Sequence, residues 1–333
     1  MTPIHNEQVR HPSAWTSREL GGKDALKLPL GSAQLDAIDS LLARTRDKRP
    51  QQVTRAEFEH PEINQLLAHV RDVIMNGRGL LIVTGITPDR YTDEQFERIY
   101  WGFGTHLGNA AVQSAFGDRL GYVQNKEGDP VKRGYRSLQE LHMHTDSYEV
   151  VGLMSVRRAK AGGLSGMVSS LAIHNAFLDT RPDLLPPLYR GYFYASDEAR
   201  FSSKIVTDDP VPVFSSVAGK LSCTYEPSHM RNAAQVRKEP LPDGLAEAFA
   251  HFDSLAARDD LAMWFVLEPG EMMLWHNYTS LHSRTAFEDD PKSKRLLLRL
   301  WLTLPQGRPC DPGFRIRAET YERIYREAVQ VPS

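Results

Sequence analysis

Apolar residues recur every three or four positions in several stretches, which is the spacing of one buried face of an α-helix. This pattern predicts helices over residues 33–48, 61–77, 92–107, 174–178 and 245–257. The third of these has a clear start signal, because Thr92 and Gln95 are placed to form a capping box. Most of the predicted helices fall in the N-terminal half of the chain.

Short runs of β-branched and other apolar residues predict the strands. These runs cover residues 78–86, 150–156, 165–171, 190–195, 211–225, 261–267, 271–275 and 296–304. The fifth run is divided by Ala218-Gly219-Lys220, as in a hairpin. Because strands do not alternate regularly with helices, the sequence predicts an α+β fold with a mainly antiparallel β core.

The apolar pattern is interrupted at the N-terminus and in two internal segments. Residues 1–30 are punctuated by Gly and Pro and are expected to form an extended arm before a single domain at 31–333. Lid-like insertions are expected at about 108–140 and 196–240 within this domain. A long segment without periodicity in a compact domain is usually functional, and the first one leads directly to His144. We therefore expect it to cover a substrate site.

Composition narrows the class of protein. The 333 residues suit one large domain, and the formal net charge of -2 gives no reason to expect a nucleic acid or an anionic membrane as partner. The two cysteines, Cys223 and Cys310, lie far apart, so neither a disulfide framework nor a thiolate zinc site is expected. The polar N-terminus does not resemble a signal peptide, and no apolar run reaches the about 18 residues that span a bilayer. The sequence favours a cytoplasmic protein and leaves a homo-oligomer open.

A candidate metal site begins at His144-Thr145-Asp146, just before the apolar run at 150–156. In an extended backbone His144 and Asp146 point to the same side and can bind one ion. Two histidines and one carboxylate with open positions are typical of non-haem Fe(II) oxygenases. The residues alone leave two candidates for the second histidine, His276 and His282.

The strand predicted after these histidines carries two arginines, Arg295 and Arg299, among leucines. A guanidinium on an apolar strand requires an anion, usually a carboxylate bound through two hydrogen bonds. Surface ion pairs with acidic residues such as Asp289 are the alternative explanation.

Taken together, these motifs resemble the TauD/TfdA group of Fe(II)- and 2-oxoglutarate-dependent oxygenases. The resemblance covers about residues 78 to 305. It is carried, in order, by His144-Thr145-Asp146-Ser147, Gly162-Gly163, Ser170-Leu171-Ala172-Ile173-His174-Asn175, Asn277, Leu281-His282-Ser283-Arg284-Thr285, Phe287-Glu288-Asp289 and Arg295-Leu296-Leu297-Leu298-Arg299-Leu300-Trp301-Leu302.

The resemblance implies a double-stranded β-helix, or jelly roll, with flanking N-terminal helices and a metal at its mouth. His144, Asp146 and His282 match the iron ligands, which leaves His276 outside the site. Arg295 matches the arginine that binds the distal carboxylate of 2-oxoglutarate. Two further contacts are implied: Ser165 beside the same carboxylate, and Arg299 beside the co-substrate or an acidic substrate.

The implied reaction oxidises an unactivated C–H bond of a small molecule, most simply by hydroxylation, with O2 consumed and succinate and CO2 released. A cationic set of residues favours an acidic or amino-acid-like substrate: Lys132, Arg133, Arg136, Arg231 and Arg299. The candidate substrate contacts are His142, Tyr135, Arg136, Tyr225, His229, Arg231 and Asn277.

Two other functions are compatible with the motifs. His142 and His144 form a His-x-His pair that a zinc-dependent hydrolase could use. A catalytically inactive binding protein could also have the jelly-roll fold, because fold does not fix function. Trp264, Trp275 and Trp301 are expected in the β core, and residues 227–242 are expected to be irregular.

Overall fold

The computed structural model of the chain describes residues 3–114, 116–126, 134–196, 202 and 204–330. Two large sheets form its centre. The larger sheet has the order β1-β2-β12-β6-β15-β3, with β4 also paired to β15, and the smaller one has the order β11-β8-β13-β5. Every strand pair in these sheets is antiparallel except β1 with β2, which confirms the expected antiparallel core.

The strands of the larger sheet are β1 Lys27–Pro29, β2 Leu80–Thr84, β3 Asn109–Ala110, β4 Gly121–Val123, β6 Val150–Arg157, β12 Met272–His276 and β15 Leu296–Thr303. Those of the smaller sheet are β5 Leu141–His144, β8 Ser165–Ser169, β11 Ala262–Phe265 and β13 Ser280–Arg284. Two further hairpins complete the set: β9 Phe214–Val217 with β10 Lys220–Cys223, and β7 Ala161–Gly162 with β14 Phe287–Glu288.

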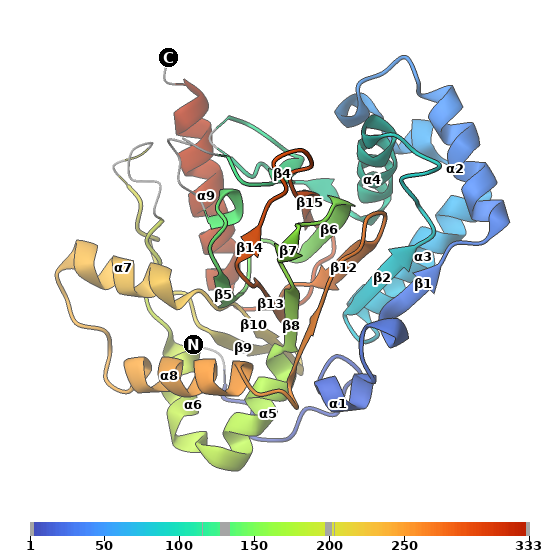
Figure 1. The fold of residues 1–333 in the computed structure, drawn as a ribbon. Coiled ribbons are helices and arrows are strands. Elements are labelled where there is room, and N and C mark those ends of the chain that lie inside the picture. The colour runs from blue at the N-terminus through green and yellow to red at the C-terminus, as the bar shows by residue number, and fades with distance from the viewer. Residues whose placement is uncertain (1–2, 115, 127–133, 197–201, 203, 331–333) are drawn as a thin grey trace.

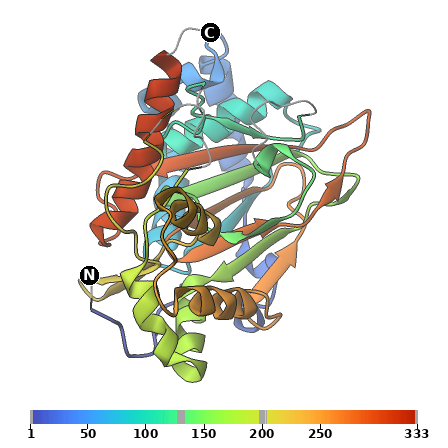
Figure 2. The same ribbon diagram turned by 90° about the vertical axis from the view of Figure 1, so that its left-hand side faces the viewer.

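The described helices are α1 Ser17–Leu20, α2 Ser32–Arg44, α3 Pro61–Met75, α4 Asp93–Leu107, α5 Ser170–Thr180, α6 Leu185–Arg190, α7 Pro227–Arg237, α8 Leu245–Ala256 and α9 Pro312–Gln330. In Figure 1, α2, α3 and α4 lie on the outer side of the larger sheet, whereas α5, α6 and α8 lie at the opposite end of the molecule. Figure 2 shows α9 lying along one side of the strands. Among the described helices, none is both long and apolar enough to cross a bilayer.

Strand alternation explains how one sheet has two cores. In β12, Met272 and Leu274 face the helices α2–α4, while Met273 and Trp275 face the smaller sheet. The inner layer also contains Met167 from the smaller sheet, so the two sheets pack face to face as in a jelly roll. A third apolar cluster joins α5, α6 and α8 to the hairpin β9–β10.

All five helices predicted from periodicity are present, but three other expectations were wrong. Of residues 227–242, the part 227–237 is not irregular, because it forms α7, which has Pro227 in its first turn and is capped by the side chain of Glu226. Trp264 is 40% exposed, since strand alternation turns it outward while its neighbours Met263 and Phe265 face the core. Residues 190–195 contain only isolated bridges, at Tyr192 and Ala195.

The N-terminal arm is not extended throughout. Thr16 caps the short helix α1, and β1 adds a parallel strand to the edge of the larger sheet. Trp15 and Leu26 are buried in the inner core, so hydrophobic packing attaches the described part of the arm to the domain.

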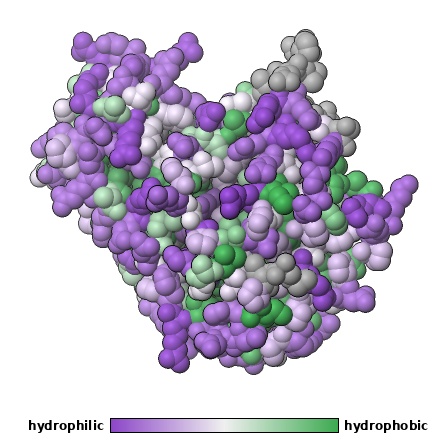
Figure 3. All heavy atoms as spheres, turned by 180° about the vertical axis from the view of Figure 1, so that it is seen from behind, coloured by the Kyte–Doolittle hydropathy of each residue, from purple (hydrophilic) through white to green (hydrophobic). Residues whose placement is uncertain are grey.

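Seen from behind, the molecule presents a mainly hydrophilic surface with scattered apolar areas (Figure 3). Its outline is hollowed between the side that carries α2 and the side that carries α9. The chemistry-bearing residues named below lie nearer the centre, between the strands and α9.

Candidate metal centre

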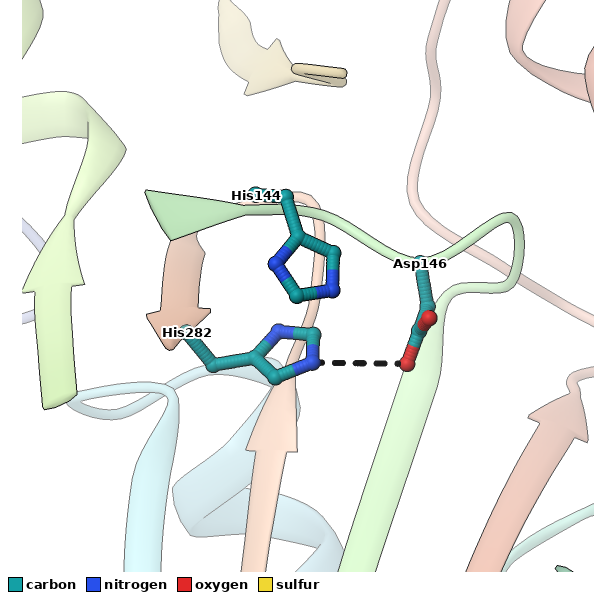
Figure 4. A group of neighbouring side chains, drawn as sticks. All are labelled: His144, Asp146 and His282. Atoms are coloured by element: carbon teal, nitrogen blue, oxygen red, sulfur yellow. Dashed lines mark ion pairs between the residues drawn. The ribbon is translucent and has the colours of Figure 1, made fainter. Parts of the chain in front are cut away.

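Three side chains converge at the end of β5. His144 is the last residue of β5, and its cross-strand partner in β13 is His282, so their rings lie 4.2 Å apart between centroids. Asp146 follows two residues later, and Nε2 of His282 lies 3.5 Å from its Oδ2. One potential ligand atom from each residue lies within 4.8 Å of the others (Figure 4). His276 is outside this group and lies 3.3 Å from Glu149 instead.

Hydrogen bonds fix the orientation of the Asp146 carboxylate and of its backbone. Trp301 Nε1 donates to Oδ2 of Asp146 at 2.7 Å. The side chain of Asn277 accepts from the Asp146 amide at 3.1 Å and donates to its carbonyl at 2.8 Å. Asn277, which we had expected to contact substrate, is completely buried and holds the loop. These are the supporting contacts that a metal ligand needs.

The protonation states suit a divalent cation. Burial alone would raise the pKa of Asp146, but the positive charge of Arg299 and the interactions with His282 and His144 lower it to about 2. Burial, followed by the neighbouring His144, lowers the pKa of His282 to about 3. The carboxylate is therefore charged and the His282 imidazole neutral. His144 donates from Nδ1 to the His142 carbonyl at 2.7 Å, which leaves Nε2 as its free nitrogen.

Sequence reasoning missed Arg317, which holds the segment Thr145-Asp146 through hydrogen bonds. This α9 residue is buried and donates through Nη1 to the Thr145 hydroxyl, the Asp146 carbonyl and the Thr224 hydroxyl. Its Nη2 donates to the Thr145 carbonyl at 2.8 Å. Nothing in the sequence indicates the contact, since the two segments are 171 residues apart.

The metal-binding group opens into a cavity of about 180 Å³. Its strand-borne wall carries Ser165 together with three buried arginines, Arg284, Arg295 and Arg299. Its helix-borne wall carries Glu226 and residues of α7 and α9. The cavity therefore has cations on its strand side and an acidic group among its helical residues.

Two of these arginines have unsatisfied donors. Among the described residues, Nη1 of Arg295 and both Nε and Nη1 of Arg284 have no hydrogen-bond partner. Nη2 of Arg284 donates to the Ser137 and Gln139 carbonyls. Both guanidinium groups lie over the ring of Phe287, at 4.8 and 5.0 Å. No carboxylate of the described residues lies within salt-bridge distance of either guanidinium.

Desolvation disfavours the charged form of the Arg284 and Arg295 guanidinium groups. Burial lowers the pKa of Arg284 to about 10, and burial together with the charge of Arg284 lowers that of Arg295 to about 9. A bound anion would supply the missing hydrogen bonds and relieve this repulsion. The alternation of β13 was a usable signal for Arg284, because it puts this residue on the same face as His282.

Arg299 is in a different environment, next to the metal-binding group. Its Nε donates to Oε1 of Gln113 at 2.8 Å, and its Nη1 lies 4.0 Å from Oδ1 of Asp146. Its guanidinium lies 4.1 Å from the ring centroid of Trp301. Trp301 is buried as expected, but it also lines the cavity.

The other predicted substrate contacts are dispersed. His229 lines the cavity, whereas His142 is exposed and, like Arg231, lines a separate outer groove. Tyr225 does not reach the cavity: it is buried, stacks on Phe252 and donates to Asp253 at 2.6 Å.

Arg136 is half-buried and away from the cavity wall. The side chain of Tyr135, and Lys132 and Arg133 entirely, are outside the described residues.

Comparison with known proteins identifies the family. The sequence model described as "Taurine catabolism dioxygenase TauD, TfdA family" matches residues 45–301. The chain belongs to the TauD/TfdA family. It is 29% identical over 258 residues to FR-33289 synthase of Streptomyces rubellomurinus, covering 73% of this chain and 74% of that protein.

Solved structures of oxygenases share the TauD/TfdA fold seen here. Asparagine oxygenase in complex with Fe(II), 2S,3S-3-hydroxyasparagine and succinate superimposes with a TM-score of 0.65 at 16% identity, over 84% of this chain and 93% of that one. The non-heme iron oxygenase OrfP, in complex with Fe, succinate and (3S)-hydroxy-L-Arg, superimposes with a TM-score of 0.62 at 13% identity, over 83% of this chain and 94% of that one. The jelly-roll core expected from the sequence is confirmed.

The chain is thus an Fe(II)- and 2-oxoglutarate-dependent dioxygenase that acts on a small molecule, as the resemblance implied. The residues present fit both cofactors. Two imidazoles and one carboxylate suit Fe(II), and the buried guanidinium donors without partners suit a dicarboxylate. The zinc-hydrolase alternative has no support, because His142 is exposed and outside the metal-binding group.

Replacement of Arg317 by Met should lower the free energy of unfolding by about 3 kcal/mol, since it leaves buried acceptors on Thr145, Asp146 and Thr224 unpaired. Urea unfolding of the metal-free protein measures this loss. Arg315→Met is the matched control, because Arg315 is exposed on the same helix and should change stability by less than about 0.5 kcal/mol. Equal effects of the two substitutions would contradict the role of Arg317.

Proposed function

We propose that the chain hydroxylates a small acidic or amino-acid-like molecule at a site in which His144, Asp146 and His282 hold Fe(II). The observation that carries this proposal is the single cavity shared by the metal-binding group and three buried arginines. Iron and 2-oxoglutarate together supply the oxidation of a C–H bond by O2, with release of succinate and CO2. The residues of the chain hold the reactants, orient the C–H bond and exclude water.

We assign the distal carboxylate of 2-oxoglutarate to Arg295 rather than to Arg299. Arg299 lies beside Asp146 and already donates to Gln113. Arg295 lies four residues earlier, about 13 Å along an extended strand, and has an unsatisfied Nη1. A dicarboxylate that binds the metal through its keto-acid end would direct its other end toward Arg295. Ser165, which lines the same cavity, would accept or donate a hydrogen bond there.

Arg284 belongs to the same proposed subsite. Its guanidinium and that of Arg295 both lie within 5.0 Å of the centroid of the Phe287 ring, so one carboxylate could accept from both. The arrangement gives the co-substrate two cationic contacts inside the protein, where such hydrogen bonds are strong.

Arg299, which lines the cavity beside Asp146, would orient an anionic group of the primary substrate near the metal. The similar structures support a substrate of amino-acid class, since they are complexes with hydroxylated asparagine and hydroxylated arginine. The lids proposed at 108–140 and 196–240 are supported by the described residues Gly134, Glu226 and His229, all of which line the cavity. The presence of a complete ligand set and of the arginines argues against an inactive binding protein.

His282→Ala should weaken Fe(II) binding by at least about 100-fold, because it removes one of three proposed ligands. His276→Ala should leave the affinity within about threefold, since His276 contacts Glu149 and not the metal-binding group. Anaerobic titration of the folded variants with Fe(II) distinguishes the two. The reverse ranking would overturn the choice of ligands.

Arg284→Gln and Arg295→Gln should each raise the KM for 2-oxoglutarate by about 10-fold or more, because each removes a charged hydrogen bond to a carboxylate. Calorimetric titration of the Fe(II)-loaded protein with 2-oxoglutarate should show the same loss of affinity. Arg190→Gln is the control, since Arg190 is exposed at the end of α6. An unchanged affinity in Arg284→Gln would remove that residue from the subsite.

A further inference from the structure

Glu226 is a half-buried acidic group held close to the metal-binding residues. The preceding residue, Tyr225, exchanges two hydrogen bonds of 2.8 Å with Thr145, the residue between His144 and Asp146. This pairing ties the backbone next to Glu226 to the metal-binding loop. The Glu226 side chain lines the same cavity as the three arginines.

The Glu226 carboxylate has only local hydrogen-bond partners. Its Oε1 accepts from the amide of Ser228 at 3.3 Å and from the hydroxyl of the same residue at 2.5 Å. Among the described residues, no donor reaches Oε2 and no cationic nitrogen lies within salt-bridge distance. Arg317 is near enough to interact electrostatically, but its Nη atoms are engaged by the metal-binding loop.

The surroundings keep this carboxylate ionised. Burial would raise the pKa of Glu226, but interactions with His229 and His144 and the hydrogen bond from Ser228 hold it below its ordinary value. A half-buried carboxylate that lines a cavity and lacks an ion-pair partner favours a ligand that brings a positive charge. Fe(II) does not meet this need, because Glu226 is outside the group of residues whose ligand atoms converge.

We infer that Glu226 binds a positively charged nitrogen of the primary substrate, an ammonium or guanidinium group. This inference rests on the proposed function and deepens it, because it makes the cavity selective for molecules with an anionic and a cationic end. The anionic end would lie at Arg299 and the cationic end at Glu226. The side chains of His229 and Tyr321 line the same cavity as Glu226 and limit the size of the cationic group. Their hydrogen bond, between the Tyr321 hydroxyl and Nδ1 of His229, is 3.1 Å long.

Matched pairs of small acids test the inference, each pair differing only in an ammonium group. The probes are taurine and ethanesulfonate, β-alanine and propionate, L-asparagine and succinamate, and 5-aminopentanoate and pentanoate. Each is titrated calorimetrically, without O2, into the protein loaded with Fe(II) and 2-oxoglutarate, and also into the metal-free protein. At least one ammonium-bearing probe should bind about 10-fold or more tightly than its partner.

Glu226→Gln should abolish this preference and leave the affinity for the ammonium-free partner unchanged. The amide keeps the shape of the side chain and an oxygen that accepts from Ser228, so the fold should be retained. Glu319→Gln, an exposed change on α9, should behave as the wild type. Iron and 2-oxoglutarate affinities of Glu226→Gln should stay within about threefold of wild type, since Glu226 contacts neither proposed subsite.

Three results would overturn the assignment: no preference for any ammonium-bearing probe in the wild type, no saturable binding by any of them, or a preference that survives in Glu226→Gln. Failure of the proposed function is a separate outcome. It would appear as a wild type that takes up neither Fe(II) nor 2-oxoglutarate, while the titrations of the metal-free protein still report on Glu226.

Discussion

The hydrogen bonds that hold the buried loop at Asp146 are the interaction on which the rest of the site depends. Asn277 binds its backbone from the turn after β12, Arg317 from the C-terminal helix, and Trp301 binds the carboxylate from β15. A charged carboxylate can be buried only when such partners replace water. Because the three partners come from different parts of the chain, the loop has its geometry only in the complete fold. The metal-binding group is thus a product of tertiary structure.

Strand geometry then explains why one cavity collects so many charges. Alternation places His282 and Arg284 on one face of β13. Arg295, the residue just before β15, is four residues from Arg299 and therefore on the same side of the extended segment. The two strands belong to opposing sheets, so their polar faces meet across the mouth of the jelly roll. Apolar residues of the same sheets form the layer behind them, and this layer keeps water from the buried ends of the arginines.

The sequence was sufficient for those parts of the molecule that depend on short-range patterns. Periodicity located five helices, and the His-x-Asp spacing singled out His144 and Asp146, although Asp146 lies in the loop after β5. It could not place Trp264, because an edge strand and a central strand have the same alternation and differ only in what covers them. It also could not show that Tyr225 turns away from the cavity, since its hydrogen bond to Asp253 depends on how α8 packs. The role of Arg317 could not be predicted either, since its contacts depend on how α9 packs.

The cavity is lined both by residues that match the family and by residues of α9 that lie beyond the match, and this difference bears on substrate specificity. The metal-binding group and the three arginines all lie within residues 45–301, the part that matches the family. Arg317 and Tyr321 lie beyond it, on α9, yet they line the same cavity. The co-substrate chemistry therefore depends on the family core, while the wall opposite the arginines depends on how α9 packs against Glu226 and His229. A change in the packing of α9 would alter which substrate fits without moving the arginines proposed to bind 2-oxoglutarate. Arg317 limits how far α9 can move, because it also supports the metal-binding loop.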